Sequence, residues 1–334
     1  MNGFEKIGAC RWLRSGASAL VMGFALIAGA HAALATGTIT SFDVPQSKGT
    51  NAQAINGGGA ITGYYVDRAT GSRFGFVRAA DGTITTFDPG DVTYATGINR
   101  RGAIVGYEDE GFVRNVRGKI ALINPKGSLQ SAAFGINKDG SIAGNYVDDN
   151  YITHGFLRTA GGKITIFDAV ANENTQAEWI NDSGVITGTY GNTSDVCHGF
   201  IRATDGTITT FNPANSYCME VLAINDSGAV TGDFTDLSGV SHGFIRAAVG
   251  TITTIDVPGA AGTFPTGINK GGEIAGFYDD GSAYRGFSRS AAGTFTYFDP
   301  PHSTDTRPSG ISDKGVITGW YAGGQSVHGF VRTP

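Results

Sequence analysis

The sequence lacks the short motifs that mark many enzyme active sites. It contains no Gly-x-Ser-x-Gly, no His-Glu-x-x-His, no phosphate-binding glycine loop and no Cys-x-x-Cys pair. No window has the apolar spacing that predicts an amphipathic helix. These absences favour an all-β chain that binds no cofactor, and they favour a binding module over an enzyme.

Basic residues are also scarce, with 24 Lys and Arg against 29 Asp and Glu and a formal net charge of −5. No block of like charges marks a tail. An acidic domain has no electrostatic footprint for nucleic acid and none for an anionic membrane surface. We therefore expect no nucleic-acid partner, no membrane insertion of the mature chain, and a monomer.

The N-terminal region has the organisation of an export signal. Basic residues precede an apolar run from Ala19 to Ala30, and small-x-small sequences follow, the first ending at Ala32. This pattern predicts a Sec-type signal peptide over residues 1–32, with an uncleaved anchor helix as the alternative. Cleavage leaves residues 33–334 as one domain in the periplasm or outside the cell.

Cysteine is rare, and its positions are informative. Cys10 leaves with the predicted signal peptide, so Cys197 and Cys218 are the two that remain. Exported proteins meet an oxidising compartment. We therefore predict a Cys197–Cys218 disulfide, with two free thiols as the alternative.

Glycine, by contrast, is abundant, with 52 residues that fall at fixed places in a repeat. The element Gly-Phe-x-Arg recurs at intervals of 36 to 44 residues between Gly75 and Arg332. Each repeat reads as four short strands: one that ends in Ile-Asn, then Ile-Thr-Gly-aromatic, Gly-Phe-x-Arg, and Thr-Ile-Thr-Thr-Phe-Asp. Turns such as Asn181-Asp-Ser-Gly184 suit a type I turn with a G1 bulge. Each repeat is therefore a predicted antiparallel meander.

Repeats of this period signal stacked architectures. A four-stranded sheet with two apolar faces is buried when copies pack radially, which predicts a seven-bladed β-propeller over residues 37–332. A linear solenoid is the alternative. The chain begins on a fourth strand, 38–43, and ends on a third strand, 328–332. We expect these two strands to pair and to close the ring.

The ordered set Ile-Asn-x-x-Gly, Ile-Thr-Gly-Tyr, His-Gly-Phe-x-Arg and Thr-Ile-Thr-Thr-Phe-Asp resembles the bacterial extracellular HAF-repeat family. The resemblance covers Gly37 to Arg332. The sequence differs from the family in the triplet that gives the family its name, because it reads His-Gly-Phe rather than His-Ala-Phe. The resemblance implies export and a repeat fold, and it implies no defined activity, substrate or cofactor.

Histidines and arginines recur with the repeat. His154, His242 and His328 are each expected beside an Asp on the neighbouring strand, but other repeats replace one partner. A catalytic site requires one constellation, so we interpret these pairs as structural locks at the blade edge. We expect the recurrent arginines to pack their stems between blades and to find an acceptor.

Residues that break the repeat are better site candidates. The residue before the Ile of the first strand is small in every other copy, but it is Trp179 in the fourth. If first strands line a central channel, this indole either plugs it or offers a stacking platform. The nearby candidates for a sugar-binding cleft are Glu173, Glu178, Glu220 and Asp305.

The loops between second and third strands vary most in length and hold Asp67, Asp148, Asp149, Asp195, Asp236, Asp279 and Asp280. Oxygen-rich loops bind Ca²⁺ in some proteins, but no calcium motif matches. We interpret these acids as solvated and predict no metal site.

Together these patterns predict an exported binding or scaffold module. Its variable loops lie on one face and contact a surface glycan or an envelope protein. The alternative is a propeller hydrolase or lyase acting on a polysaccharide at the channel mouth, for which the candidate carboxylates would have to converge.

Overall fold

The structure is a computed structural model that describes residues 37–334, except residue 91 and residues 192–196. Every regular element in these ranges is a β-strand, which confirms the all-β prediction. The described part contains no helix of the length and apolarity needed to span a membrane. The predicted signal peptide lies outside these residues.

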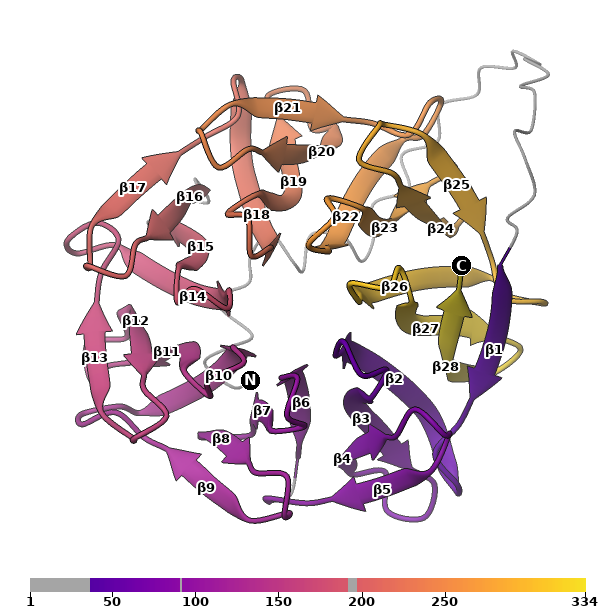
Figure 1. Cartoon of the computed structure of the whole chain (residues 1–334), viewed down its shortest axis with the longest axis horizontal. Coiled ribbons are helices and arrows are strands. Elements are labelled where there is room, and N and C mark those ends of the chain that lie inside the picture. Colours follow the sequence, from indigo (N-terminus) through magenta and orange to yellow (C-terminus); the bar gives the residue numbers. More distant parts are fainter. Residues whose placement is uncertain (1–36, 91, 192–196) are drawn as a thin grey trace.

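The strands pair antiparallel in units of four that are arranged around a central axis (Figure 1). In two places a single parallel bridge, Gly49 with Val327 and Ser241 with Gly262, joins neighbouring units into one eight-stranded sheet. The first strand of each unit lies innermost and the fourth outermost. The first strands of units 1 to 7 are β2 (Ser47–Ile55), β6 (Tyr94–Ile98), β10 (Gln130–Ile136), β14 (Asn174–Ile180), β18 (Ser216–Ile224), β22 (Gly262–Ile268) and β26 (Asp305–Ile311). The second strands are β3 (Ile61–Asp67), β7 (Ile104–Tyr107), β11 (Ile142–Val147), β15 (Ile186–Gly191), β19 (Val230–Asp236), β23 (Ile274–Asp279) and β27 (Ile317–Gly323).

The outer strands follow in the same order. The third strands are β4 (Arg73–Arg78), β8 (Gly111–Arg114), β12 (Thr153–Arg158), β16 (Cys197–Arg202), β20 (Ser241–Arg246), β24 (Tyr284–Arg289) and β28 (Ser326–Thr333). The fourth strands are β5 (Ile84–Phe87), β9 (Ile120–Ile123), β13 (Ile164–Phe167), β17 (Ile208–Phe211), β21 (Ile252–Ile255), β25 (Phe295–Phe298) and, for unit 7, β1 (Thr38–Phe42).

The Gly-Phe-x-Arg element joins each unit to its neighbours. Its Phe is fully buried in every unit. Its Gly has no room for a side chain, since a Cβ at Gly199 would lie 2.5 Å from the ring of Phe211. In five units its Arg lies over a Phe ring of the unit before it, as Arg202 does over Phe167 at 4.9 Å. The Nε atoms of several of these arginines, including Arg202, are buried without a hydrogen-bond acceptor. The predicted packing between units is therefore correct, and an acceptor is present as well, because Arg202 Nη1 donates to the Ala203 carbonyl at 3.4 Å and four other units have the equivalent bond.

The turns between strands have the predicted geometry. In the turn that starts at Asn181, the Gly184 N–H donates to the Asn181 carbonyl and the Asn181 N–H donates to the Val185 carbonyl. Gly184 has a φ of 88°, which only glycine adopts at little cost. Because strands alternate in direction, these turns lie on one face, which we call the turn face. The longer loops, between second and third strands and between units, lie on the other, the loop face.

The turn-face asparagines also link the units to one another. Asn181 Nδ2 donates to the Asn225 carbonyl at 3.1 Å, and the equivalent bond recurs from unit 1 through to Ser312 of unit 7. Its Oδ1 meanwhile accepts two N–H groups of its own turn. Ser312 is too short to continue the series to Asn56.

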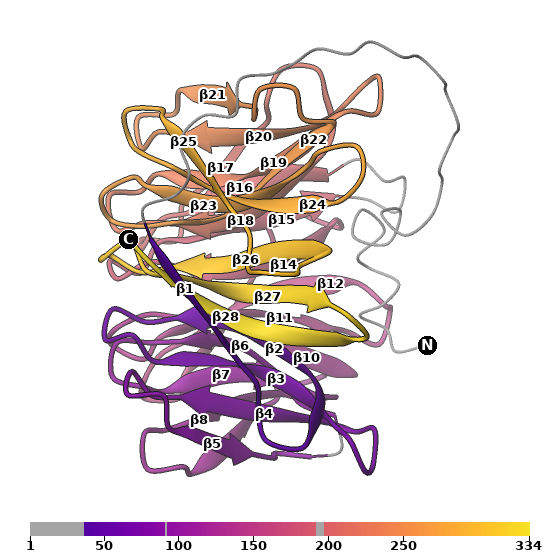
Figure 2. The ribbon, with the colours of Figure 1, turned by 90° about the vertical axis from the view of Figure 1, so that its right-hand side faces the viewer.

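The N-terminal strand β1 is the fourth strand of unit 7. It pairs antiparallel with β28 from Thr38↔Thr333 to Phe42↔Gly329, and the two strands lie side by side in both ribbon views (Figure 2). Units 7 and 1 also touch at the axis, where Ser309 Oγ donates to the Ala52 carbonyl at 2.7 Å. The predicted partner of the first strand is therefore correct.

Candidate functional site

A cavity of about 410 Å³ lies on the axis. Side chains from all units contribute to its wall, because the wall is made of first and second strands. This volume falls within the range of small-molecule sites. The cavity is therefore the candidate site.

A β-bulge at one position of every first strand supplies a ring of cavity residues. At this position the antiparallel register skips one residue in each unit, for example between Ala177 and Trp179 in β14. The skipped residues all line the cavity; they are Gln53, Thr96, Phe134, Glu178, Leu222, Thr266 and Ser309. A bulge redirects side chains, so here it turns one extra residue per unit toward the axis.

Small donors of this ring bind the neighbouring unit. Thr96 Oγ1 donates to the Ala133 carbonyl at 2.9 Å and Thr266 Oγ1 donates to the Pro308 carbonyl at 2.9 Å. Between units 4 and 5 the donor is Trp179, whose Nε1 lies 3.2 Å from the Val221 carbonyl oxygen. The indole is therefore anchored at its polar edge while the side chain lines the cavity.

A second ring comes from the residue that follows the Gly of each second strand. These residues are Tyr64, Tyr107, Asn145, Thr189, Asp233, Phe277 and Trp320, and all of them except Asn145 and Thr189 line the cavity. Each lies directly opposite a first-strand residue, as Tyr107 lies opposite Tyr94 and Trp320 opposite Arg307. Directly opposed residues point to the same side of a sheet, so each unit presents one such pair. The pairs differ in chemistry from unit to unit.

Aromatic side chains form one wall of the cavity. The Tyr64 and Tyr94 ring centroids are 5.0 Å apart, Tyr94 and Tyr107 are stacked at 5.1 Å, and Tyr107 lies 5.5 Å from Phe134. Trp320 extends this wall into unit 7. We call these five residues the aromatic wall.

Carboxylates from units 4 and 5 line another part of the cavity: Glu178 from β14, Glu220 from β18 and Asp233 from β19. Glu178 and Glu220 are half-buried, whereas Asp233 is 2% exposed. Units 4 and 5 lie across the axis from unit 1 (Figure 1). We call these three residues the acidic wall.

One arginine also lines the cavity. Arg307 lies with its guanidinium carbon 4.0 Å from the Tyr284 ring centroid and 5.5 Å from that of Trp320. Its Nε donates to Asp305 at 3.1 Å. The charge of Arg307 is therefore already compensated by a carboxylate and by aromatic faces.

The predicted site residues divide into two groups. Glu178, Trp179 and Glu220 share the cavity. Glu173 precedes β14 and Asp305 pairs with Arg307, and neither contributes to the wall that surrounds the cavity. The aromatic wall and Asp233 were not predicted, although the variation after the second-strand Gly was the available signal.

The recurrent histidines lie outside the cavity and form clamps between strands. His242 lies 3.0 Å from Asp256 through Nδ1 and 3.4 Å from Asp236 through Nε2. Hydrogen bonds from the Val240 N–H, Ser238 and His242 lower the pKa of Asp236 to about 2. Burial works against a charged His242, but its bonds to Asp256 and Asp236 outweigh burial and raise its pKa. The interpretation of these pairs as structural locks agrees with this geometry.

The loop acids mainly cap their own turns. Asp67 accepts the N–H groups of Ala69 and Thr70, and Asp280 accepts those of Ser282 and Ala283. Asp195 lies outside the described residues. Within residues 37–334, gaps excepted, no group of three or more His, Cys, Asp or Glu is placed to hold a metal ion.

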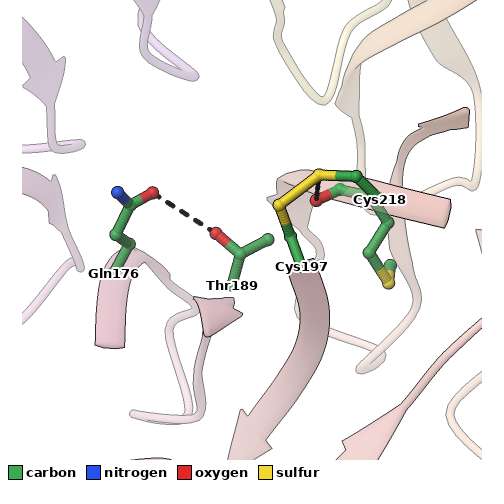
Figure 3. The surroundings of a disulfide bond; sticks show 5 residues. Gln176, Thr189, Cys197 and Cys218 are labelled. Atoms are coloured by element: carbon green, nitrogen blue, oxygen red, sulfur yellow. Dashed lines mark hydrogen bonds between the residues drawn. A yellow bond between two sulfur atoms is a disulfide. The ribbon is translucent and has the colours of Figure 1, made fainter. Parts of the chain in front are cut away.

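The predicted disulfide is present. Cys197 of β16 and Cys218 of β18 are bonded, with 4.5 Å between their Cα atoms (Figure 3). Thr189 and Gln176 lie beside it and share a 3.4 Å hydrogen bond. The bond joins the third strand of unit 4 to β18, the first strand of unit 5, which also carries Glu220.

No protein-family model matches the sequence, and no curated protein does. Solved structures do. Streptogramin B lyase superposes with a TM-score of 0.60 at 14% identity, covering 88% of this chain and 97% of that one. The β-propeller domain of the Trilobed protease from Pyrococcus furiosus gives 0.61 at 10% identity, with 84% and 95% covered. TolB from Acinetobacter baumannii gives 0.52 at 13%, with 71% and 62% covered. At these identities the likeness concerns the fold alone, and the chain has a β-propeller fold.

Proposed function

We propose that the chain is an exported seven-bladed β-propeller that binds a glycan in its axial cavity. The observation that carries this proposal is a cavity in which an aromatic wall faces an acidic wall. Sugar rings have apolar C–H faces and polar edges. Tyr and Trp suit such ligands, because their rings stack while their polar atoms still bond.

Ring closure supports a rigid cavity. In this proposal β1 completes the seventh blade and joins both ends of the chain. Phe42 of β1 makes a 6.0 Å edge-on contact with Phe76 of unit 1, as Phe87 does with Phe112 at 6.1 Å in the next joint. A cavity lined by every unit keeps its shape only if each joint holds, so closure and binding are linked.

Export and membership of the HAF-repeat family are further parts of the proposal. The Cys197–Cys218 disulfide is typical of proteins that mature in an oxidising compartment. The repeated residues that carry the resemblance all have packing roles here, in turns, in buried Phe side chains and in contacts between units. They account for the fold and leave recognition to the variable cavity residues.

Two other roles follow from particular observations. An envelope protein would contact the loop face, where Tyr151 and Leu237 are more than three-quarters exposed. An enzyme acting on a polysaccharide would use the carboxylates of Glu178 and Glu220, which share the cavity with the aromatic wall. The first role would place the ligand on the loop face, and the second would cleave the glycan, whereas the proposed function is reversible binding of an intact glycan in the cavity.

A glycan array probed with the mature protein tests the proposal. We expect a defined set of glycans to bind, and we expect Trp320→Ala and Tyr107→Ala to weaken that binding about tenfold or more. Tyr151→Ala on the loop face is the control and retains binding. Loss of binding in the control alone would place the ligand on the loop face. Shortened glycans after incubation would favour the enzyme.

A further inference from the structure

A further feature of the cavity is an arginine that is held in place along one edge. We propose that Arg307 and Trp320 form a subsite for a neutral hexose unit, in which Arg307 donates to two adjacent hydroxyls of the sugar ring. This inference rests on the proposed glycan binding and specifies its ligand: the bound unit has a free vicinal diol and no acidic group.

The guanidinium group of Arg307 is fixed in orientation. Its Nε donates to Asp305 Oδ1 at 3.1 Å and its Nη2 donates to Asp305 Oδ2 at 3.3 Å, so the carboxylate occupies one edge. Its carbon lies 4.0 Å from the Tyr284 ring centroid, so an aromatic ring restrains its flat face. An arginine held on one edge and one face loses little conformational freedom when a ligand binds to it.

The opposite edge of this guanidinium is free to donate. An arginine has five N–H donors, and every hydrogen bond that Arg307 makes with a described residue goes to Asp305. Arg307 lines the cavity, and its side chain is 26% exposed. The donors of Nη1 and one donor of Nη2 are therefore available to a ligand in the cavity.

Unit 7 differs from the other units in having this pair. No other described first strand has a basic residue at the position of Arg307. The counterparts of Asp305 are all uncharged: Gly49, Val92, Gln130, Asn174, Cys218 and Gly262. Because the other units fold without such a pair, packing does not require it, and the pair is a local addition at the cavity.

The charge of the pair decides the class of ligand. Asp305 already neutralises Arg307, so a ligand carboxylate on the free edge would bring an uncompensated negative charge into a half-buried site, which is costly. Hydroxyl oxygens accept hydrogen bonds without adding charge. Two hydroxyls on neighbouring ring carbons offer a pair of acceptors to one guanidinium edge, as a carboxylate does. Asp305 is therefore a positioning residue that also selects against acidic sugars.

Trp320 supplies the apolar part of the subsite. It lies directly opposite Arg307 in the antiparallel register and lines the cavity. The centroid of its ring is 5.5 Å from the guanidinium carbon of Arg307. A hexose whose hydroxyls bond to Arg307 therefore has its C–H face within reach of the indole. The two residues match the polar edge and the apolar face of one sugar ring.

Calorimetric titration of the mature protein with matched oligosaccharides tests the subsite. The probes are the β-1,4-linked tetramers of glucose and mannose, and the β-1,4-linked tetramers of glucuronic acid and mannuronic acid, at about pH 7, where carboxylates are ionised. We expect at least one neutral tetramer to bind, and we expect the corresponding uronate to bind about tenfold more weakly or worse.

Matched variants locate the effect. Arg307→Lys keeps the charge but loses the paired donors, so we expect the neutral tetramer to bind about tenfold more weakly. Asp305→Asn leaves Arg307 uncompensated, and we expect the uronate to gain about tenfold relative to the neutral tetramer. A merely structural role of Asp305 would weaken both tetramers equally. The control is Arg289→Lys, the same change at an arginine that lies over Phe295 at 5.8 Å outside the cavity, and it keeps both affinities.

The outcomes separate this inference from the proposed function. Tighter binding of a uronate to the unmodified protein overturns the neutral-sugar subsite and keeps glycan binding, and so does full affinity in Arg307→Lys. If no tetramer binds, the subsite is overturned and the glycan array decides the proposed function. Array binding that Trp320→Ala weakens keeps that function, whereas an array without any bound glycan overturns it.

Discussion

The guanidinium carbon of Arg78 lies 5.0 Å from the centroid of the Phe42 ring. Arg78 belongs to unit 1, whereas Phe42 belongs to the N-terminal strand that completes unit 7. The same contact joins Arg114 to Phe87 and Arg332 to Phe298 in joints where the chain is continuous. The chain is continuous at this joint as well, since β1 runs directly into β2, and the two ends of the chain meet instead inside unit 7, where β1 pairs with β28.

Phe42→Ala tests this joint. It removes the ring that Arg78 and Phe76 contact, and we expect a loss of about 3 kcal/mol in the free energy of unfolding. Thr40→Ala, on an exposed position of the same strand, is expected to change it by less than about 0.5 kcal/mol. Chemical denaturation measures both. A loss that is equally small in both variants would show that β1 contributes little to ring stability.

Ser312→Asn is expected to stabilise the protein. Six joints have an Asn amide that donates to the next unit, and Ser312 leaves the seventh without one. An Asn here would donate to the Asn56 carbonyl and contribute about 1 kcal/mol. Thermal unfolding measures the gain, with Asn181→Ser as the reverse change. A lower melting temperature for Ser312→Asn would contradict the proposed geometry of the joint.

The His242 clamp predicts how stability depends on pH. The pKa of His242 is raised above its ordinary 6.5, so its contribution is full below that value and is lost as pH rises through the raised pKa. Asp236, with its pKa lowered to about 2, contributes above its ordinary 3.8 and loses this as pH falls toward 2. The deficit of His242→Gln in melting temperature is therefore greatest between about pH 4 and 6 and shrinks as pH rises through the raised pKa of His242. A deficit that does not vary with pH would exclude an ionic clamp.

Removal of the disulfide tests whether units 4 and 5 need a staple. Cys197→Ser with Cys218→Ser opens a link that spans 21 residues, and we expect a loss of about 3 kcal/mol. Reduction of the unmodified protein would lower its melting temperature, and reduction of the double variant would not. Two labelled thiols in unreduced, exported protein would contradict the bond.

The fold could be predicted from the sequence because the same strand and turn motifs recur in each repeat. Turn glycines such as Gly184 and buried Phe such as Phe200 recur at every copy, and each has a local cause. The pairing of 38–43 with 328–332 followed from a missing fourth strand. The turns, the buried Phe side chains and the strand pairing depend on residues nearby in the chain or on an adjacent strand, so the repeated sequence pattern predicts them.

The cavity was harder to predict, because a bulge decides which residues face it. Glu178 and Trp179 both line the axis, whereas regular alternation would place one of them on the other side. The second strand was described as Ile-Thr-Gly-aromatic, so Asp233, which occupies the aromatic position in unit 5, was not recognised as a site candidate. Asp305 appeared free in the sequence, but it pairs with Arg307 two residues along.

Tryptophan spectroscopy tests the central claim most directly. The chain has three tryptophans; Trp12 lies in the predicted signal peptide, and Trp179 and Trp320 both line the cavity. In mature protein labelled with 5-fluorotryptophan, each ¹⁹F signal is assigned by replacing one Trp with Phe, and a glycan that binds on the array is then titrated. The account predicts that both signals shift along one binding curve with the calorimetric affinity. Calorimetric binding that leaves both signals unmoved would place the ligand outside the cavity and contradict it.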